Sequence, residues 1–175
     1  MNKIFFFMAA VVLFSCNNET KQQTELPGEF KYTSYHLNNS RDSFGLSLNH
    51  YLQIAKDGNY RLLLRNDNGQ AGYYYGFIGF ENIAVLDDFI ADSSILVTDT
   101  VSKTSGETIF RLDYTTGKGE KEIKFSSATE PERVKTVRAI LDSIIASPGK
   151  KQSSHFNIDG YLKKIIAEDS VGSKE

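Results

Sequence analysis

The segment from residue 46 to residue 54 alternates apolar and polar side chains, as does the segment from residue 60 to residue 65. A period of two residues is typical of half-buried strands. A three-residue loop at Lys56-Asp57-Gly58, with Gly58 in the left-handed conformation, keeps the apolar faces together, whereas a two-residue turn would scramble them. The loop pairs Ile54 with Tyr60, Leu52 with Leu62 and His50 with Leu64. The predicted inner face of the first strand holds Leu46, Leu48, His50, Leu52 and Ile54.

The dipeptide Asn68-Gly69 predicts a second hairpin directly after the first. A two-residue type I′ turn needs a positive φ at both central residues, which Asn and Gly tolerate best. The resulting register pairs Leu64 with Tyr73, Leu62 with Tyr75 and Tyr60 with Phe77. Both turns then agree on one inner face, and together they predict a three-stranded meander over residues 46–78.

A helix and further strands are predicted after this meander. Between Glu81 and Ala91 the apolar side chains recur at helical spacing, at Ile83, Val85, Leu86, Phe89 and Ile90. Residues 95–101 indicate a short strand, and residues 108–114 alternate again. A Gly117-Lys118 turn of type II′ pairs Leu112 with Ile123 and Phe110 with Phe125.

Two helix starts follow in the last third of the chain. Thr129 and Glu132 have the spacing of a capping box, with Pro131 in the first turn, and they predict a helix over residues 130–146. The buried stripe of this helix is Val134, Val137, Leu141 and Ile144. Asp159 is the predicted cap of a final helix that carries Leu162, Ile165 and Ile166.

The order of these elements predicts an α+β fold in which antiparallel β-meanders carry packed helices on one face. Three strands and a helix are followed by the same pattern, so a duplicated βββα unit is an open alternative within this class. A closed eight-stranded barrel is the other alternative, and the strong helix over residues 130–146 argues against it.

The first sixteen residues, MNKIFFFMAAVVLFSC, place Lys3 before an unbroken apolar run from Ile4 to Phe14. This run suits the core of a signal peptide and is too short to span a bilayer, which needs about 20 residues. The stretch Leu13-Phe14-Ser15-Cys16 resembles the lipobox of bacterial lipoproteins. The resemblance implies cleavage before Cys16 by type II signal peptidase, and acylation of the Cys16 thiol and the new α-amino group. Two or three acyl chains would hold the protein on a membrane essentially permanently.

The predicted organisation is a signal peptide over residues 1–15, a lipid-anchored tether over residues 16–27 and a single domain over residues 28–170. Cys16 is the only cysteine, so the domain must be stable without a disulfide. In the better-known sorting system for lipoproteins, an Asp after the cysteine marks retention in the inner membrane. Asn17 therefore favours the outer membrane, with the periplasmic face as the first expectation and surface exposure as the alternative.

The predicted domain resembles small Bacteroidetes lipoproteins of uncharacterised families. The segments that carry this resemblance, besides the lipobox, are AKDGNYRLLL, YYYGFIGFENIAVLDDFI and ERVKTVRAILDSI, and they lie between residues 46 and 146. Since these families lack an assigned activity, the resemblance implies a compartment and an architecture and no function.

Composition excludes several function classes. The chain has 20 basic and 22 acidic residues and a net charge of −2, which argues against a nucleic-acid partner. His36, His50 and His155 show no pattern typical of a catalytic triad, and His50 is expected to be a buried histidine held by one hydrogen bond. No motif predicts a metal site or a cofactor.

One group of side chains predicts a binding surface on the face of the meander opposite the core. Tyr51, Leu63 and Tyr74 form a row there, flanked by Arg61 and Arg65, while Gly72 and Gly76 leave gaps in the third strand. Arginine forks beside tyrosine rings suit a carboxylate or a partner loop. The alternative is that residues 30–37 cover this face, or that it lies in solvent.

These observations predict a lipid-anchored protein of the cell envelope whose domain is a non-catalytic binding module. Its expected partners are the membrane, through Cys16, and either another envelope protein or a small anionic ligand. Two alternatives remain open at this point. One is an inhibitor or immunity-type protein that blocks an enzyme, and the other is a hydrolase with an unrecognised site at His50 or His155.

Overall fold

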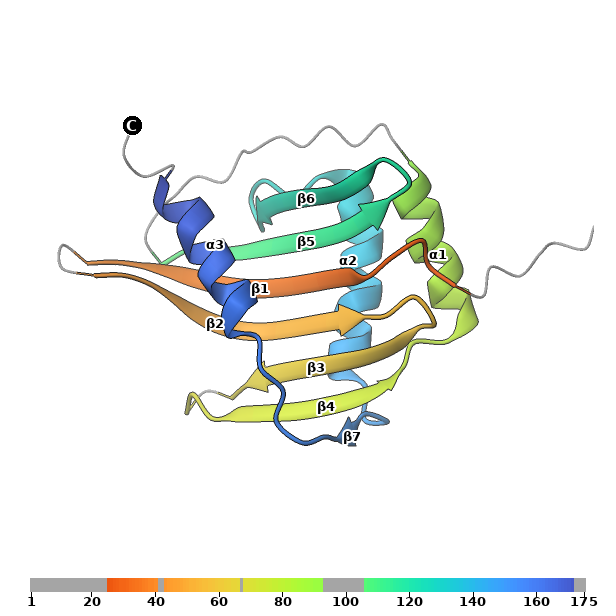
Figure 1. The fold of residues 1–175 in the computed structure, drawn as a ribbon, viewed down its shortest axis with the longest axis horizontal. Helices are drawn as coiled ribbons and strands as arrows, with labels where there is room; N and C mark the ends of the chain where they lie inside the picture. The colour runs from red at the N-terminus through yellow and green to blue at the C-terminus, as the bar shows by residue number, and fades with distance from the viewer. Residues whose placement is uncertain (1–24, 41–42, 67, 93–105, 172–175) are drawn as a thin grey trace, which may run out of the picture.

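The computed structural model describes residues 25–40, 43–66, 68–92 and 106–171, which form one antiparallel sheet and three helices (Figure 1). The described sheet has seven strands in the order β6-β5-β1-β2-β3-β4-β7. The strands are β1 Phe30–Ser40, β2 Ser43–Ile54, β3 Asn59–Arg65, β4 Ala71–Phe77, β5 Thr108–Thr116, β6 Gly119–Ser126 and β7 Lys151–Gln152. The helices are α1 Phe80–Ala91, α2 Glu132–Ala146 and α3 Asp159–Val171. The predicted α+β class is confirmed.

Helices cover both faces of the sheet. α1 and α2 pack on one side, called the inner face, and α3 crosses the other side, called the outer face (Figure 1). The main core lies between the inner face and its two helices, with Leu52, Leu62 and Leu112 of the sheet packed with Leu86 and Leu141. The expectation that all helices lie on one face is therefore wrong for α3. The reason is that the outer face has apolar clusters of its own, which Ile165 and Leu162 of α3 complete.

Strand β1 lies inside the sheet, where it pairs with β2 on one edge and with β5 on the other. Residues 30–37 therefore lie within the sheet and do not lie across one of its faces. Because β1 comes first, four strands precede α1, and the predicted βββα unit does not match the first half of the fold. The predicted strand at residues 95–101 lies outside the described residues. Leu26 is 2% exposed and belongs to the core, so the fold begins before residue 28.

The β2–β3 hairpin has the predicted register, with Ile54 opposite Tyr60, Leu52 opposite Leu62 and His50 opposite Leu64. The Ala55 amide donates to the Asn59 carbonyl, and the Gly58 amide donates to the Ala55 carbonyl. Gly58 has a φ of 80°, as the three-residue loop requires.

The predicted inner face of β2 is wrong for its first half, because a β-bulge interrupts the alternation. His50 lies opposite Ser34, but Leu48 lies opposite Tyr35, so Asn49 is an extra residue in β2. One extra residue moves every earlier side chain to the other face. Leu46 and Leu48 consequently belong to the outer clusters, while His50, Leu52 and Ile54 keep the inner face.

The predicted register of the β3–β4 hairpin is wrong by one residue. The structure pairs Leu62 with Tyr74 and Tyr60 with Gly76, where the prediction paired them with Tyr75 and Phe77. The loop repeats the hydrogen bonds of the β2–β3 loop: the Asn66 amide donates to the Gln70 carbonyl, and the Gly69 amide donates to the Asn66 carbonyl. This register also puts Gly76 beside Tyr60, where an added Cβ would lie 2.5 Å from the phenol oxygen.

The β5–β6 hairpin has the predicted pairs, with Leu112 opposite Ile123 and Phe110 opposite Phe125. Its turn type differs from the prediction, because Gly119 has the positive φ and Gly117 does not. The Thr116 hydroxyl closes this turn by donating to the Gly119 carbonyl and accepting from the Lys118 amide.

Helices α1 and α2 bury most of the predicted apolar stripes. The buried residues are Ile83, Leu86, Phe89 and Ile90 in α1, and Val134, Val137, Leu141 and Ile144 in α2.

The predicted helix caps differ from the observed ones. The α2 capping box does not form: Thr129 accepts a hydrogen bond from the Ser126 amide, and Glu132 pairs with Lys135. In α3, the side chain of Asn157 accepts the hydrogen bond of the Asp159 amide, so the cap role predicted for Asp159 falls to Asn157.

The two loop glycines should differ in how much stability is lost when alanine replaces each of them. Both Gly58 and Gly69 have a positive φ. Backbone strain should therefore lower the free energy of unfolding by about 1 kcal/mol in each of Gly58→Ala and Gly69→Ala. An added Cβ at Gly58 would also lie 2.6 Å from Ile83 Cδ1, whereas the position at Gly69 is open. Gly58→Ala should therefore lower the free energy of unfolding in urea by about 1–3 kcal/mol more than Gly69→Ala. Equal losses would contradict this packing of the β2–β3 loop.

Candidate functional site

The five residues of the predicted binding surface do not share one surface. Tyr74 packs against the inner core, while the other four lie on the outer face. Tyr51 is 3% exposed and Leu63 is 4% exposed, since the segment from Phe156 to Leu162 packs over them.

The two arginines of the predicted surface are exposed, as expected, but the C-terminal segment lies beside them. Arg61 lies 5.3 Å from the ring centre of Phe156 and donates to Gln53, and Arg65 donates to the Gly69 carbonyl. The outer face of this meander is therefore largely an interior surface, and the cover is the C-terminal segment.

A buried ion cluster fastens α3 to the outer face. Arg111 of β5 has no exposed surface, and its guanidinium lies 2.8 Å from Asp113, 2.7 Å from Glu122 and 2.5 Å from Glu168 of α3. The Tyr161 hydroxyl of α3 donates to Asp113 at 2.5 Å. Pairing of this kind is needed because a buried guanidinium without partners would be very costly.

A second set of contacts extends the cluster towards the end of α3. Lys124 of β6 contacts Asp169 at 3.0 Å, and the buried Tyr35 hydroxyl donates to Asp169 at 2.8 Å. Burial alone would lower the pKa of Arg111, but Asp113 and Glu168 outweigh this effect and raise it. Burial likewise opposes the charge of Lys124, and Glu122 and Asp169 outweigh it and raise its pKa. Both cations therefore stay charged, and the cluster serves to hold α3.

The three histidines make different contacts. His36 lies within hydrogen-bond distance of Asn49, and His155 packs against the ring of Tyr73. His50 lies on the inner face against Tyr32, and its buried Nε2 atom has no hydrogen-bond partner among the described residues. The single hydrogen bond expected at His50 is therefore not formed by Nε2. Within the described ranges, no group of His, Cys, Asp and Glu side chains could hold a metal ion.

The surroundings of His50 keep its ring neutral. Burial lowers the pKa of His50 to about 4, and the Arg138 guanidinium adds to the effect. Arg138 is itself held by Glu130 at 3.0 Å and Asp142 at 3.3 Å, and Asp142 accepts a hydrogen bond from Tyr32. This arrangement serves the packing of α2 on the sheet.

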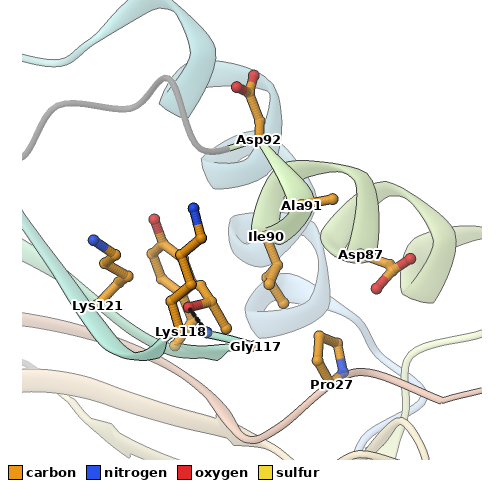
Figure 2. Close-up of a pocket in the computed structure, with 10 residues that line it drawn as sticks. Pro27, Asp87, Ile90, Ala91, Asp92, Gly117, Lys118 and Lys121 are labelled. Atoms are coloured by element: carbon orange, nitrogen blue, oxygen red, sulfur yellow. Dashed lines mark hydrogen bonds between the residues drawn. The ribbon is translucent and has the colours of Figure 1, made fainter.

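A pocket of about 400 Å³ lies between the end of α1 and the β5–β6 hairpin (Figure 2). Pro27, Ile90 and the ring of Tyr114 provide its apolar surface. Its polar lining includes Lys118 and Lys121 from the hairpin, Asp87 of α1 and Asp92 directly after α1. The pocket thus combines segments that are distant along the chain: residue 27, the end of α1, and the β5–β6 hairpin.

The basic and acidic side chains of this pocket lie on different sides of it. Figure 2 shows Lys118 and Lys121 on the hairpin side, with Ile90 between them and Asp87. Asp92 forms an ion pair with Arg133 of α2, which offsets its charge. Burial, and secondarily the neighbouring Asp88, raise the pKa of Asp87. An anionic group is therefore expected beside the two lysines, and an apolar group over Ile90 and Pro27.

The pocket residues were not singled out from the sequence. Lys118 was predicted only as a turn residue. No local motif joins them, because the pocket depends on the packing of α1 beside the hairpin. The weak signal in the sequence was one lysine in a tight turn, Lys118, and a second lysine three residues later, Lys121.

Comparison with known proteins assigns the chain to no family. No protein-family model, no curated protein and no solved structure matches the chain significantly. Among the helices of the described residues, none is both long enough and apolar enough to cross a membrane.

The neutral His50 should make stability depend on pH. Below about pH 6.5 the unfolded chain takes up a proton at His50, whereas the folded chain does so only near pH 4, so stability falls over this range as pH falls. The complete loss of folding free energy that this difference in pKa causes is roughly 3 kcal/mol. His50→Leu should therefore lose less stability than the wild type between about pH 7 and about pH 4.5 in urea unfolding curves. His155→Leu, which changes an exposed histidine, is the matched control. An unchanged pH dependence in His50→Leu would contradict the burial of this ring.

Proposed function

We propose that the protein is a lipoprotein of the cell envelope, anchored through acyl chains on Cys16, whose domain is a non-catalytic binding module for a small amphipathic anion. The observation that carries the ligand is the pocket between α1 and the β5–β6 hairpin, with two lysines above an apolar floor. The outer membrane is the proposed location, with the domain on its periplasmic face.

The proposed anchor is supported by the N-terminal sequence and by the point where the fold begins. Cys16 ends an apolar run and is followed by the polar residues 17–25. Leu26 is then buried in the core, and its amide donates to the Lys56 carbonyl at 2.7 Å. The eight residues 17–24, fully extended, span at most about 30 Å, so the acyl chains would keep the domain near the bilayer.

The ligand class follows from the chemistry of the lining. The ammonium groups of Lys118 and Lys121 and the hydroxyl of Tyr114 can donate to a carboxylate or a phosphate. Ile90, Pro27 and the Tyr114 ring suit a short apolar chain. A volume near 400 Å³ is within the usual range for small-ligand sites.

The positions and contacts of the three histidines also support a binding role without catalysis. His50 does not line the pocket, and its pKa of about 4 keeps it neutral beneath α2. His36 and His155 contact Asn49 and Tyr73, at other places in the fold. The pocket itself offers lysines and a tyrosine, which suit recognition of an anion.

Replacing the proposed lipidation site should release the protein from the membrane. Cys16→Ala should move the protein from the membrane fraction to the soluble fraction with its circular dichroism spectrum unchanged, because the acyl chains would be lost while the core that includes Leu26 is kept. Intact-mass analysis of the wild type should show cleavage before Cys16 and added acyl mass. A wild-type chain that starts at another residue and stays soluble would overturn the anchor.

Removing the two pocket lysines should weaken binding of an amphipathic anion. Hexyl phosphate and hexanoate are suitable probes, measured by equilibrium dialysis against the lipidated protein in nanodiscs with empty nanodiscs as the blank. Lys118→Ala combined with Lys121→Ala should weaken binding roughly tenfold, since each exposed ion pair contributes up to about 1 kcal/mol. Hexanol should bind both forms equally.

The matched control changes two exposed lysines elsewhere, Lys151→Ala with Lys163→Ala, and alters the net charge by the same amount. This control should bind the probes as the wild type does. Equal affinity in the pocket variant and in the control would exclude the pocket as the anion site.

A further inference from the structure

We propose that the exposed rings of Phe77 and Phe80 form a contact with the lipid bilayer, and that they orient the anchored domain with this end of its sheet against the membrane. This inference rests on the lipid anchor of the proposed function. It adds a surface and an orientation that the anchor alone does not require.

Phe77 and Phe80 form an exposed aromatic pair at the junction of β4 and α1. Phe77 is 47% exposed and Phe80 is 48% exposed, and their ring centres lie 5.4 Å apart in an edge-to-face arrangement. Phe77, Phe80 and Tyr75, which is 45% exposed, are the large apolar side chains most open to solvent in the described part of the chain. Paired phenyl rings at a surface are typical of an interaction site, because leaving them in water forfeits the free energy of burial.

The aromatic pair lies at the same end of the sheet as the point where the chain enters the fold. The amide of Leu26 donates to the carbonyl of Lys56 in the β2–β3 loop. Gly58 of that loop accepts from the Ile78 amide, and an added Cβ at Gly58 would lie 2.9 Å from the ring of Phe77. Figure 1 likewise shows the first described residues beside the start of α1. One loop therefore contacts both the incoming chain and the aromatic pair.

The length of chain before Leu26 favours a membrane as the occupant of this surface. An acylated Cys16 would be at most about 30 Å from Glu25, so this end of the sheet is held closer to the bilayer than any other. The β3–β4 loop lies at the far end of β3, about 20 Å further along the strand direction. Tethering raises the effective concentration of the bilayer near these rings, so even a weak aromatic contact would be populated.

The charges near Phe77 and Phe80 favour an apolar contact with the bilayer over an electrostatic one. Lys56 lies beside Asp57 in the loop, and Glu81 follows Phe80 in α1, so the surroundings of the rings carry no excess of positive charge. Aromatic side chains by themselves partition into the headgroup region of a bilayer. The contact should therefore form on neutral phosphatidylcholine and should not need anionic lipid.

The absence of tryptophan from the sequence allows a direct test. Phe80→Trp introduces the only tryptophan at the proposed contact, and Gln70→Trp introduces the only tryptophan in the β3–β4 loop as the matched control. Each lipidated full-length protein is reconstituted into phosphatidylcholine vesicles with or without brominated acyl chains. Bromine near the headgroup region should quench roughly half or more of the emission at position 80 and shift it to the blue, while position 70 should change little. Phe77→Trp is a second reporter of the same pair.

The outcomes separate the contact from the anchor. Co-sedimentation with vesicles reports the anchor, and quenching reports the contact. If the protein sediments with vesicles but positions 77 and 80 are quenched no more than position 70, the contact is overturned and the anchor stands. If the wild-type chain does not sediment with vesicles, the anchor fails and the orientation fails with it. Quenching at positions 77 and 80 in neutral vesicles, and not at position 70, supports the proposal.

Discussion

The pairing of β1 with two neighbours is the interaction on which the rest of the structure depends. Its hydrogen bonds to β2 and β5 join the β2–β3–β4 meander to the β5–β6 hairpin, which share no other strand. Tyr32 of β1 packs in the inner core and Tyr35 packs in an outer cluster, so this one strand supports the helices of both faces. The pocket depends on it as well, because β1 holds the hairpin that carries Lys118 and Lys121 beside the end of α1.

How far the fold could be predicted differs from element to element. The β2–β3 and β5–β6 registers were predicted correctly, because turn chemistry and alternation agree there. The β3–β4 register was wrong because Asn-Gly fits both a two-residue turn and a three-residue loop, and packing of Tyr60 against Gly76 decides between them. The bulge at Asn49 was not foreseen, because nothing in the local sequence shows that β1 would need Leu48 opposite Tyr35.

The candidate site was less predictable than the fold, for two physical reasons. The predicted surface around Tyr51 and Leu63 is covered by the start of α3 and the residues just before it, and this cover depends on the ion pair between Arg111 and Glu168, which is 57 residues later in the chain. The pocket, in turn, combines Pro27 with Lys118 and Lys121, whose proximity follows from strand order. The covered surface and the pocket both result from charges and strands that pair across long stretches of the chain. Such long-range pairing leaves no pattern in a short window of sequence.

The edge strand β6 has a consequence for how copies of this sheet can meet. No other described strand pairs with its outward edge, and an edge of this kind can pair with a strand of another chain. Residues 120–122 and 124 of β6 alternate acidic and basic side chains, and Lys124 and Glu122 are already committed to the ion cluster that holds α3. A neighbouring strand would have to disturb these charges in order to pair. The same residues that hold the last helix thus discourage the sheet from extending into a polymer.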